Sequence, residues 1–573
     1  MTKKYLINYL QKKIDYQKNS KIIFKDEYLL NYFSKKQRQP YDCSYIEDLN
    51  EVYNKNKDEL FIIKKVTKYR SFLRDNLNKI HQTNLSKNEW GLLLDYYLIV
   101  SIISIRRKIK TYRKIKDKKI FINVISGDFF FKDTKSIYDE LSFGTSVNKF
   151  LDYIILKKLK FKNLIILNQK IKFRNYKNKK KLISFSMLFL NIIIKIFKPN
   201  IIIDGYFGVF KSIQIMFLSK FKILFLKEKF LNTPNNLNRK NNNLRKKINI
   251  PEKDFFDKIF NEYNKEIFPS SFLENFKSFY NSNKELSKGF QSIGTAILLH
   301  ISDNFKFLTL NVKKRDGKIV SFQHGGLFGM RKFSPEDYII QKYADIKFNW
   351  HDKNGIGAPY FHKKLKTSKK KNGLLFFPSQ TLFQEMTENL KECNHLYLNK
   401  YWKLYNLINS DKKKLIKFKF FNQLVKKTLK KLWMKNTNGK IRFEEENYKG
   451  NVYGKYRITV IDNFSTALFE LIYYSQPFII VSNSKQKEFT KEFRKTLNYL
   501  KSLNILFDSE KKAADFINNN YDNLDSWWNK ILKNRKFKII KKRLFPIEEF
   551  NNSKFINNFT QQLRLGKGNI KIS

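Results

Sequence analysis

The sequence predicts an α/β protein in which two parallel-sheet domains face one cleft, with an additional helical region at the N-terminus. Short β-branched runs alternate with helical stretches on both sides of a lysine-rich segment at 363–372. Two of these runs, 317–320 and 456–461, end in polar loops that restart as helices, at 321–329 and 462–470. Open α/β sheets bind ligands in that place, beyond the carboxyl ends of their strands.

The length of 573 residues is too great for one hydrophobic core, so two domains are expected. Apolar side chains recur at helical spacing through 69–77 and 90–105, which predicts a mostly helical start. The predicted divisions are a helical N-terminal region, a first α/β domain, a second α/β domain and a C-terminal helical segment, at 1–115, 116–362, 373–530 and 531–573.

Strands are predicted wherever a short apolar run ends at a polar residue or a turn. In the first α/β domain these runs are expected to form one sheet, at 121–125, 163–167, 199–206, 223–226, 296–300 and 318–322. In the second domain they lie at 373–378, 456–461 and 477–481. A basic, Asn-rich stretch at 232–247 is expected to be exposed. The apolar run 182–194 is shorter than the ~20 residues of a membrane helix and is expected to be a buried helix.

The composition indicates a packed but strongly basic protein. Aromatic residues make up 16% of the chain, and 114 Lys and Arg against 51 Asp and Glu give a net charge of +63. The lysines are spread along most of the chain and accompany abundant Asn, Ile, Phe and Tyr, as drift in an AT-rich genome would produce. No dedicated nucleic-acid binding is therefore expected, whereas anionic membranes and phosphorylated substrates would be attracted.

Several kinds of site are excluded by missing patterns. Cys43 and Cys393 stand alone, which predicts neither a disulfide framework nor a zinc site. No Gly-x-Gly-x-x-Gly follows the early strands, and Walker-type and nucleophile-elbow motifs are missing. No metal and no cofactor are expected.

The N-terminus lacks a signal-peptide pattern, so we expect a cytoplasmic protein, peripheral at the inner face of the cytoplasmic membrane.

The first polar loop carries His324, followed by Gly325, Gly326 and Gly329. Glycines let the backbone approach a ligand closely, and a histidine at a strand end can donate to a phosphate or act as a base. The alternative is a histidine packed under a turn with no chemical role.

The second polar loop places Ser465 and Thr466 where a helix would start, and helix N-termini attract anions. Glu470 follows Thr466 by one turn, so its carboxylate would face the same side and could accept hydrogen bonds from sugar hydroxyls. The alternative is an ordinary cap, with Ser465 as the N-cap residue and Glu470 in solvent.

These loops, with other short segments, resemble a family of transferases encoded in bacterial surface-carbohydrate gene clusters. The family is similar to GT-B glycosyltransferases, which have two Rossmann-like domains, and distantly to the CDP-glycerol glycerophosphotransferases. The chain differs from the family at Asn349-Trp350-His351, where Trp-Gly-Trp is frequent, and at Phe469, where Leu is frequent. The matching segments are 77–90, Phe268-Pro269, 272–274, the Gln-His-Gly-Gly loop, Glu336-Asp337, Ala344-Asp345, 462–466 with Glu470, Ala513-Ala514 and Trp527-Trp528.

The resemblance implies a metal-independent glycosyltransferase with its nucleotide donor in the second domain and its acceptor in the first. His324 is the first candidate for the base and Glu336 the second, while Asp128 and Asp204 would face the acceptor. The donor would be bound by Gln323, Gly325, Gly326, Ser379, Thr381, Arg442, Asp462, Asn463, Ser465, Thr466 and Glu470.

The implied partners are a nucleotide-activated donor and a glycan or lipid-linked acceptor of a surface polysaccharide. The donor is left open between a nucleotide hexose, a CMP-activated ulosonic acid and CDP-glycerol. Lys455, Lys487 or Arg494 would pair with the carboxylate of an acidic sugar. Two other functions stay open, a catalytically silent nucleotide- or carbohydrate-binding homologue and a basic protein that binds nucleic acid or anionic membranes.

Overall fold

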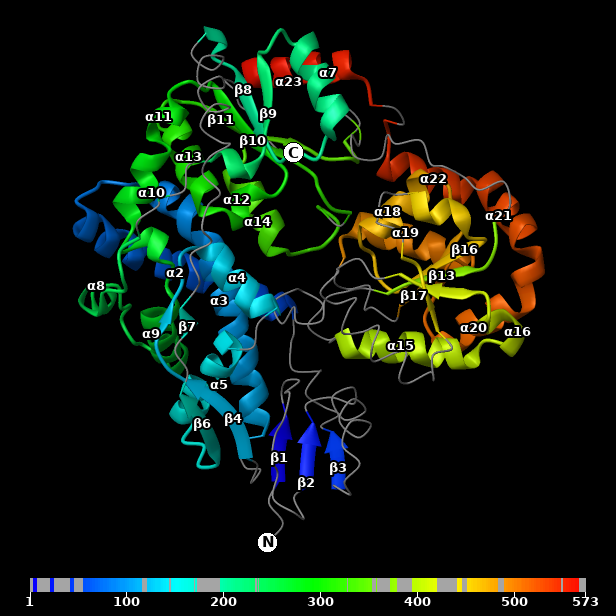
Figure 1. Ribbon diagram of the computed structural model, residues 1–573, viewed down its shortest axis with the longest axis horizontal. Helices are drawn as coiled ribbons and strands as arrows, with labels where there is room; N and C mark the ends of the chain where they lie inside the picture. Colours follow the sequence, from blue (N-terminus) through cyan, green and yellow to red (C-terminus); the bar gives the residue numbers. More distant parts are fainter. Residues whose placement is uncertain are drawn as a thin grey trace.

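The computed structural model confirms the predicted α/β class, because every strand pair within its sheets is parallel. Three large sheets succeed one another along the chain, and helices cover the faces of the second and third sheets (Figure 1). The structure describes residues 4–7, 21–24, 42–45, 55–115, 121–143, 146–168, 171–172, 196–231, 234, 237–326, 328–352, 357, 371–378, 394–419, 441–445, 451–482, 489–547 and 550–565.

The first sheet has the strand order β3-β2-β1-β4-β6. Its members are β1 (Lys4–Ile7), β2 (Lys21–Phe24), β3 (Asp42–Tyr45), β4 (Phe121–Ser126) and β6 (Leu164–Asn168). The expected single sheet for residues 116–362 is therefore wrong, since β4 pairs with β1 near the N-terminus and β6 pairs with β4. The four-residue strands β1 to β3 lie in a Lys- and Asn-rich stretch, where no alternation is long enough to indicate them.

Two long helices follow, as expected: α2 (Lys55–His81) and α3 (Lys87–Lys114). Ser86 and Glu89 form a reciprocal capping box at the start of α3. α3 is buried on nearly all sides between α2, α5 (Ser146–Lys158), α9 (Phe255–Ile267), α13 (Asp303–Lys313) and α14 (Pro335–Tyr343). The helical region thus shares one hydrophobic core with the second sheet, whose Ile293 and Ile319 belong to it.

The second sheet has the order β12-β11-β10-β8-β9. Its strands are β8 (Asn200–Ile203), β9 (Ile223–Leu226), β10 (Ser292–Thr295), β11 (Lys318–Phe322) and β12 (Ile346–Phe348), and α7 (Val209–Leu218) joins β8 to β9. The strand expected at 296–300 is wrong, because β10 ends earlier and α12 (Leu298–Ile301) begins there. Thr295 accepts a hydrogen bond from the amide of Leu298 at 3.1 Å, which turns the chain out of the sheet.

The third sheet forms the second α/β domain, in the order β15-β14-β13-β16-β17-β18. The strands are β13 (Leu374–Phe377), β14 (Ile416–Phe418), β15 (Arg442–Phe443), β16 (Ile458–Ile461), β17 (Phe478–Val481) and β18 (Leu506–Phe507). The helices are α15 (Asn394–Leu407), α16 (Ser410–Lys413), α18 (Thr466–Tyr473), α19 (Lys491–Ser502) and α20 (Glu510–Asn520).

The C-terminal helices join the two halves of the molecule. α21 (Leu524–Lys533) and α22 (Arg535–Leu544) pack on the third sheet, whereas α23 (Asn552–Leu565) lies beside α7 at the second sheet (Figure 1). Phe555 and Phe559 of α23 pack against Phe322 of β11. The chain therefore crosses back over the junction, which holds the second and third sheets together.

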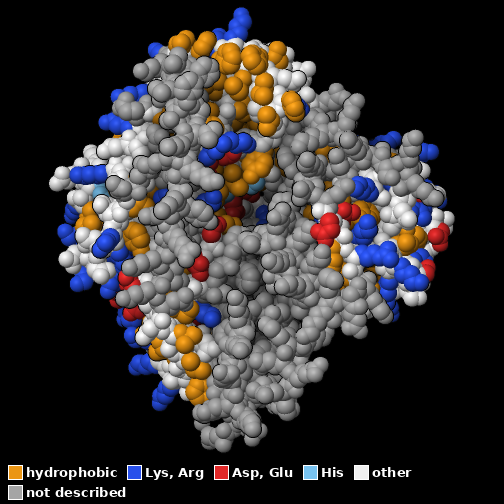
Figure 2. Space-filling model, viewed as in Figure 1, with side chains coloured by type: hydrophobic (Ala, Val, Ile, Leu, Met, Phe, Trp, Pro, Cys, Tyr) orange, Lys and Arg blue, Asp and Glu red, His pale blue; other side chains and the backbone are white. Residues whose placement is uncertain are grey.

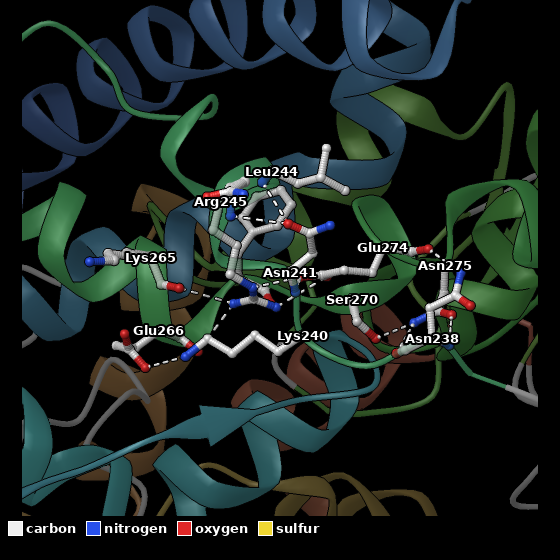
Figure 3. A network of polar contacts seen from close by, with 12 residues as sticks. Asn238, Lys240, Asn241, Leu244, Arg245, Lys265, Glu266, Ser270, Glu274 and Asn275 are labelled. Atoms are coloured by element: carbon white, nitrogen blue, oxygen red, sulfur yellow. Dashed lines mark hydrogen bonds and ion pairs between the residues drawn. The ribbon is translucent and has the colours of Figure 1, made fainter.

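The basic stretch at 232–247, expected to be exposed, contributes a buried arginine (Figure 3). Arg245, in the short helix α8 (Asn242–Lys246), donates to Glu274 from Nε at 2.7 Å and to the carbonyl of Phe268 at 3.0 Å. A buried charge is stable only when it is paired in this way, so the arginine fixes the stretch onto the domain.

The remaining helices and strands are α4 (Thr134–Phe143), α10 (Phe276–Ser282), α11 (Lys284–Ser287), β5 (Phe129–Phe130) and β7 (Ile171–Lys172).

Among the described residues, no helix has the length and apolar character needed to span a bilayer. The run 182–194, expected to be a buried helix, lies outside the described residues.

Candidate functional site

The candidate site begins where β11 ends, in a loop held by Gln323. The buried side chain of Gln323 donates from Nε2 to the carbonyl of Gly325 at 2.8 Å. Its Oε1 accepts from the amide of Trp350 at 2.8 Å. Because both bonds go to backbone, Gln323 fixes the shape of the loop that presents His324.

His324 is fixed in one tautomer. Its Nδ1 lies 2.8 Å from the carbonyl oxygen of Ala296, and a carbonyl only accepts, so Nδ1 carries the proton. Nε2 is then the acceptor of the ring. The ring packs edge-on against Phe328 with 4.8 Å between centroids and lies 6.2 Å from the ring of Tyr206. Burial lowers the pKa of His324, so the imidazole is neutral at pH 7.

Glu336 lies near His324, in the first turn of α14. Its Oε1 accepts from the Tyr96 hydroxyl at 3.2 Å and its Oε2 from the Ser334 hydroxyl at 2.7 Å. Its negative charge acts on His324 in the direction that raises the pKa, against the effect of burial. A carboxylate in this position would stabilise the imidazolium that forms when His324 accepts a proton.

His300, which was not predicted as a site residue, lies behind His324. It is fully enclosed, and its ring lies 6.1 Å from that of His324 and 5.1 Å from that of Tyr96. Burial holds its pKa well below the usual value, and its Nδ1 makes no hydrogen bond. A lone histidine in an apolar run does not indicate a functional site in the sequence, because only the fold brings it to His324.

Figure 2 shows a hollow in the middle of the molecule, where histidine and acidic side chains are visible.

The second loop leads into α18. Asn463 accepts from the amide of Ser465 at 3.2 Å, and Ser465 is the N-cap residue, as the capping alternative predicted. The Ser465 side chain makes no capping hydrogen bond. The first turn therefore has no side-chain cap from Ser465, and uncapped helix N-termini favour anions.

The two loops are in contact across the junction. A Cβ built on Gly325 would lie 3.8 Å from the Thr466 hydroxyl oxygen, which is ordinary contact distance. A Cβ built on Gly326 would lie only 2.1 Å from Cδ2 of Phe469. Phe469 is buried against Trp350 and Phe545, so the loop can pass there only because residue 326 has no side chain.

Glu470 is buried, which makes the solvent-exposed alternative wrong. Its Oε2 accepts from the hydroxyl of Tyr453, in the 3-10 helix Asn451–Lys455, at 2.8 Å. Burial raises the pKa of Glu470 to about 8, so at pH 7 the group is mostly protonated. It would therefore meet a ligand as a neutral carboxylic acid. Asp462, at the end of β16, is buried as well.

Other predicted site residues lie apart from the contact between the His324 loop and α18. Asp128 pairs with Lys240 at 2.7 Å, beside the first sheet. Asp204 ends β8 at the same sheet edge as His324, but it accepts from the amide of Glu228 and lies 3.6 Å from Lys227. Arg442 is exposed on the edge strand β15, which β14 and β13 separate from β16.

Three of the predicted residues, Ser379, Thr381 and Lys487, lie outside the described residues. Lys455 lies in the same 3-10 helix as Tyr453, and Arg494 lies in α19 with a buried Nε that makes no hydrogen bond. Within the described part of the chain, no three His, Cys, Asp or Glu side chains are grouped to hold a metal ion.

Comparison with known families agrees with the resemblance seen in the sequence. Residues 8–540 match the LIC12162 family transferase. The chain belongs to this transferase family. No curated protein matches this LIC12162 family protein.

Solved structures similar to this LIC12162 family protein include glycosyltransferases. A candidate UDP-N-acetylglucosamine 2-epimerase from Listeria monocytogenes has 9% identity and a TM-score of 0.33, covering 64% of this chain and 96% of its own. The calicheamicin glycosyltransferase CalG4 has 9% identity and a TM-score of 0.32, covering 64% and 98%. The spinosyn rhamnosyltransferase SpnG has 8% identity and a TM-score of 0.27, covering 64% and 98%.

Proposed function

We propose that the protein is a glycosyltransferase that moves a sugar from a nucleotide-activated donor to a glycan or lipid-linked acceptor. The observation that carries the proposal is the contact between the His324 loop and the N-terminus of α18. The loop that carries His324, whose neutral imidazole can accept a proton, packs through Gly326 on the first turn of α18, and a helix N-terminus favours anions. A base for the acceptor hydroxyl and a group that stabilises the departing phosphate would both assist inverting transfer from a phosphate donor.

In the proposed reaction, the His324 loop and the start of α18 each have one role. The acceptor hydroxyl gives its proton to Nε2 of His324 while its oxygen bonds to the anomeric carbon of the donor. The bond from that carbon to the phosphate oxygen breaks, and the electron pair leaves with the phosphate. The amides at the start of α18 would stabilise the departing phosphate, and Glu336 would stabilise the protonated His324. This route inverts the configuration at the anomeric carbon.

Further parts of the proposal concern the acceptor, the cellular location of the reaction and the role of Glu470. We propose that the acceptor is a surface polysaccharide precursor and that transfer takes place at the inner face of the cytoplasmic membrane. The net charge of +63 supports attraction to anionic donors and to anionic lipids. The protonated Glu470 could donate a hydrogen bond to a donor hydroxyl, and it adds no negative charge near the phosphate. We propose that the reaction needs no metal ion.

A thermal-shift screen tests the proposed function. We expect one nucleotide among CMP, CDP, UDP and GDP, or its sugar, to raise Tm by about 2–4 °C at 100 times its Kd. A CMP response would favour an ulosonic acid donor, and a UDP or GDP response would favour a hexose donor. A CDP response would indicate CDP-glycerol, to which the proposed step at an anomeric carbon does not apply.

The other functions are distinguished by adding an assay of donor turnover and an assay of DNA binding to the screen. A silent homologue would be stabilised by a nucleotide but would not turn over its sugar conjugate. A nucleic-acid-binding protein would ignore every nucleotide and bind DNA with an affinity that falls steeply with salt. The last result would contradict the proposed function.

A further inference from the structure

The outer face of α7 is an exposed apolar surface on the second sheet. Phe210 is 85% exposed, Val209 68%, Phe217 65% and Leu218 57%. Ile196, 66% exposed, lies just before β8 in the chain, and Phe197 contacts Phe221, which in turn contacts Phe217. We use the name α7 surface for the exposed side chains of this group, which are Ile196, Phe197, Val209, Phe210, Ile213, Phe217 and Leu218. Hydrophobic side chains gather over α7 in Figure 2. Exposed apolar groups gathered in one place indicate a binding surface, whereas scattered ones do not.

The position of α7 is fixed from its other side. Ile215 is buried beneath the helix, and α23 packs along it, with Asn552 donating to Gln214 at 3.1 Å. Lys211 lies over the ring of Phe550 at 4.5 Å. The exposed residues therefore cannot turn inward without unpacking α7 from α23.

The charge around the α7 surface is almost entirely positive. Lys198, Lys220 and Lys222 are exposed beside it, and α7 itself contains no acidic residue. Between residues 196 and 227 the single acidic side chain is Asp204, which lies 3.6 Å from Lys227. A second copy of this chain would carry the same net charge of +63 and be repelled, whereas an anionic bilayer would be attracted.

We infer that the α7 surface docks the protein on an anionic lipid bilayer. The phenylalanines would enter the boundary between headgroups and acyl chains, and the lysines would contact the anionic headgroups, as in interfacial helices. A ten-residue helix is about 15 Å long, half of a bilayer core, so it would lie in the surface and not cross it.

The docked surface would adjoin the candidate site. Tyr206, 44% exposed, stands in the loop between β8 and α7, and its ring lies 6.2 Å from that of His324. Docking through α7 would therefore bring His324 close to the lipid surface, where a lipid-linked acceptor is anchored. The docking itself does not depend on the proposed transfer reaction.

Vesicle flotation of the full chain tests the inference. The probes are vesicles of phosphatidylcholine alone and of phosphatidylcholine with about one-third phosphatidylglycerol. We expect binding to the anionic vesicles only, and Phe210→Ser combined with Phe217→Ser should weaken it about tenfold or more, since both rings lose their burial in lipid. Lys220→Gln with Lys222→Gln should weaken binding and reduce its sensitivity to salt.

Leu60→Ser is the matched control, because Leu60 is 73% exposed on α2, outside the α7 surface. It should bind vesicles as the wild type does. Equal binding of the double Phe variant and the wild type would overturn the inference, as would equal binding to both kinds of vesicle. Loss of self-association in the double Phe variant, with no vesicle binding by the wild type, would show that the surface joins two copies instead. Nucleotide-induced stabilisation should be the same in all variants, so failure of docking is distinguishable from failure of the proposed function.

Discussion

Replacing His324 with Asn is expected to lower kcat/KM for sugar transfer by about 10²–10⁴-fold and to leave Tm nearly unchanged. Asn is a fair replacement because its amide nitrogen can still donate to the Ala296 carbonyl, which His324 reaches from Nδ1 at 2.8 Å. It has no counterpart of the Nε2 base. The measurement is initial-rate transfer at varied donor concentration, together with Tm by calorimetry.

The pH profile separates a base from a packing residue. Burial lowers the pKa of His324, so the wild type should lose activity only as the pH falls below the ordinary histidine value of about 6.5. Protonation occupies Nε2 below that point, and the rate falls with it. The Asn variant should show a low rate without this acidic limb. Transfer by the variant at the wild-type rate would mean that His324 has no chemical role.

Replacing Gly326 with Ala should damage both stability and transfer. The new Cβ would lie 2.1 Å from Cδ2 of Phe469, a ring enclosed by Trp350, Phe493 and Phe545. Overpacking of this kind costs about 1–3 kcal/mol of unfolding free energy. Moving the His324 loop by even about 1 Å from the start of α18 can lower the rate by about 10²-fold. The measurements are chemical denaturation and transfer rate.

The neighbouring glycine supplies the matched control for stability. Gly325→Ala adds the same methyl group one residue earlier, where the nearest atom would be 3.8 Å away, so its Tm should stay near that of the wild type. Combining Gly326→Ala with Phe469→Leu removes the ring atoms in conflict and should restore much of the stability and rate. If Gly326→Ala alone behaves like Gly325→Ala, the two loops are not packed as described.

The fold was predictable where the chain carries long periodic patterns. α2, α3 and the strands that lead into both polar loops follow directly from apolar spacing. The division of the strands between two sheets was not predictable, because β1 to β3 are four residues each and the pairing of β1 with β4 joins distant segments of the chain. The buried Arg245 was missed for a related reason, since its partner Glu274 lies 29 residues later in the chain.

The two polar loops of the candidate site were predictable from the sequence, but the residues that pack around them were not. His324, Thr466 and Glu470 stand out in the sequence because glycines, hydroxyls and a strand end surround them. The burial of Glu470 against Tyr453 and the position of His300 behind His324 depend on packing between elements. A sequence pattern gives the chemistry of a side chain, whereas its pKa and its partners come from the tertiary structure.

Hydrogen–deuterium exchange of the full chain with and without the stabilising nucleotide tests most directly whether the two loops form one site. Exchange slows wherever a ligand suppresses local opening. The close packing of Gly326 on Phe469 predicts that the nucleotide will protect peptides from both 321–330 and 462–473 over the same concentration range. Protection of the second segment alone, or of neither, would contradict a shared site between the two halves of the molecule.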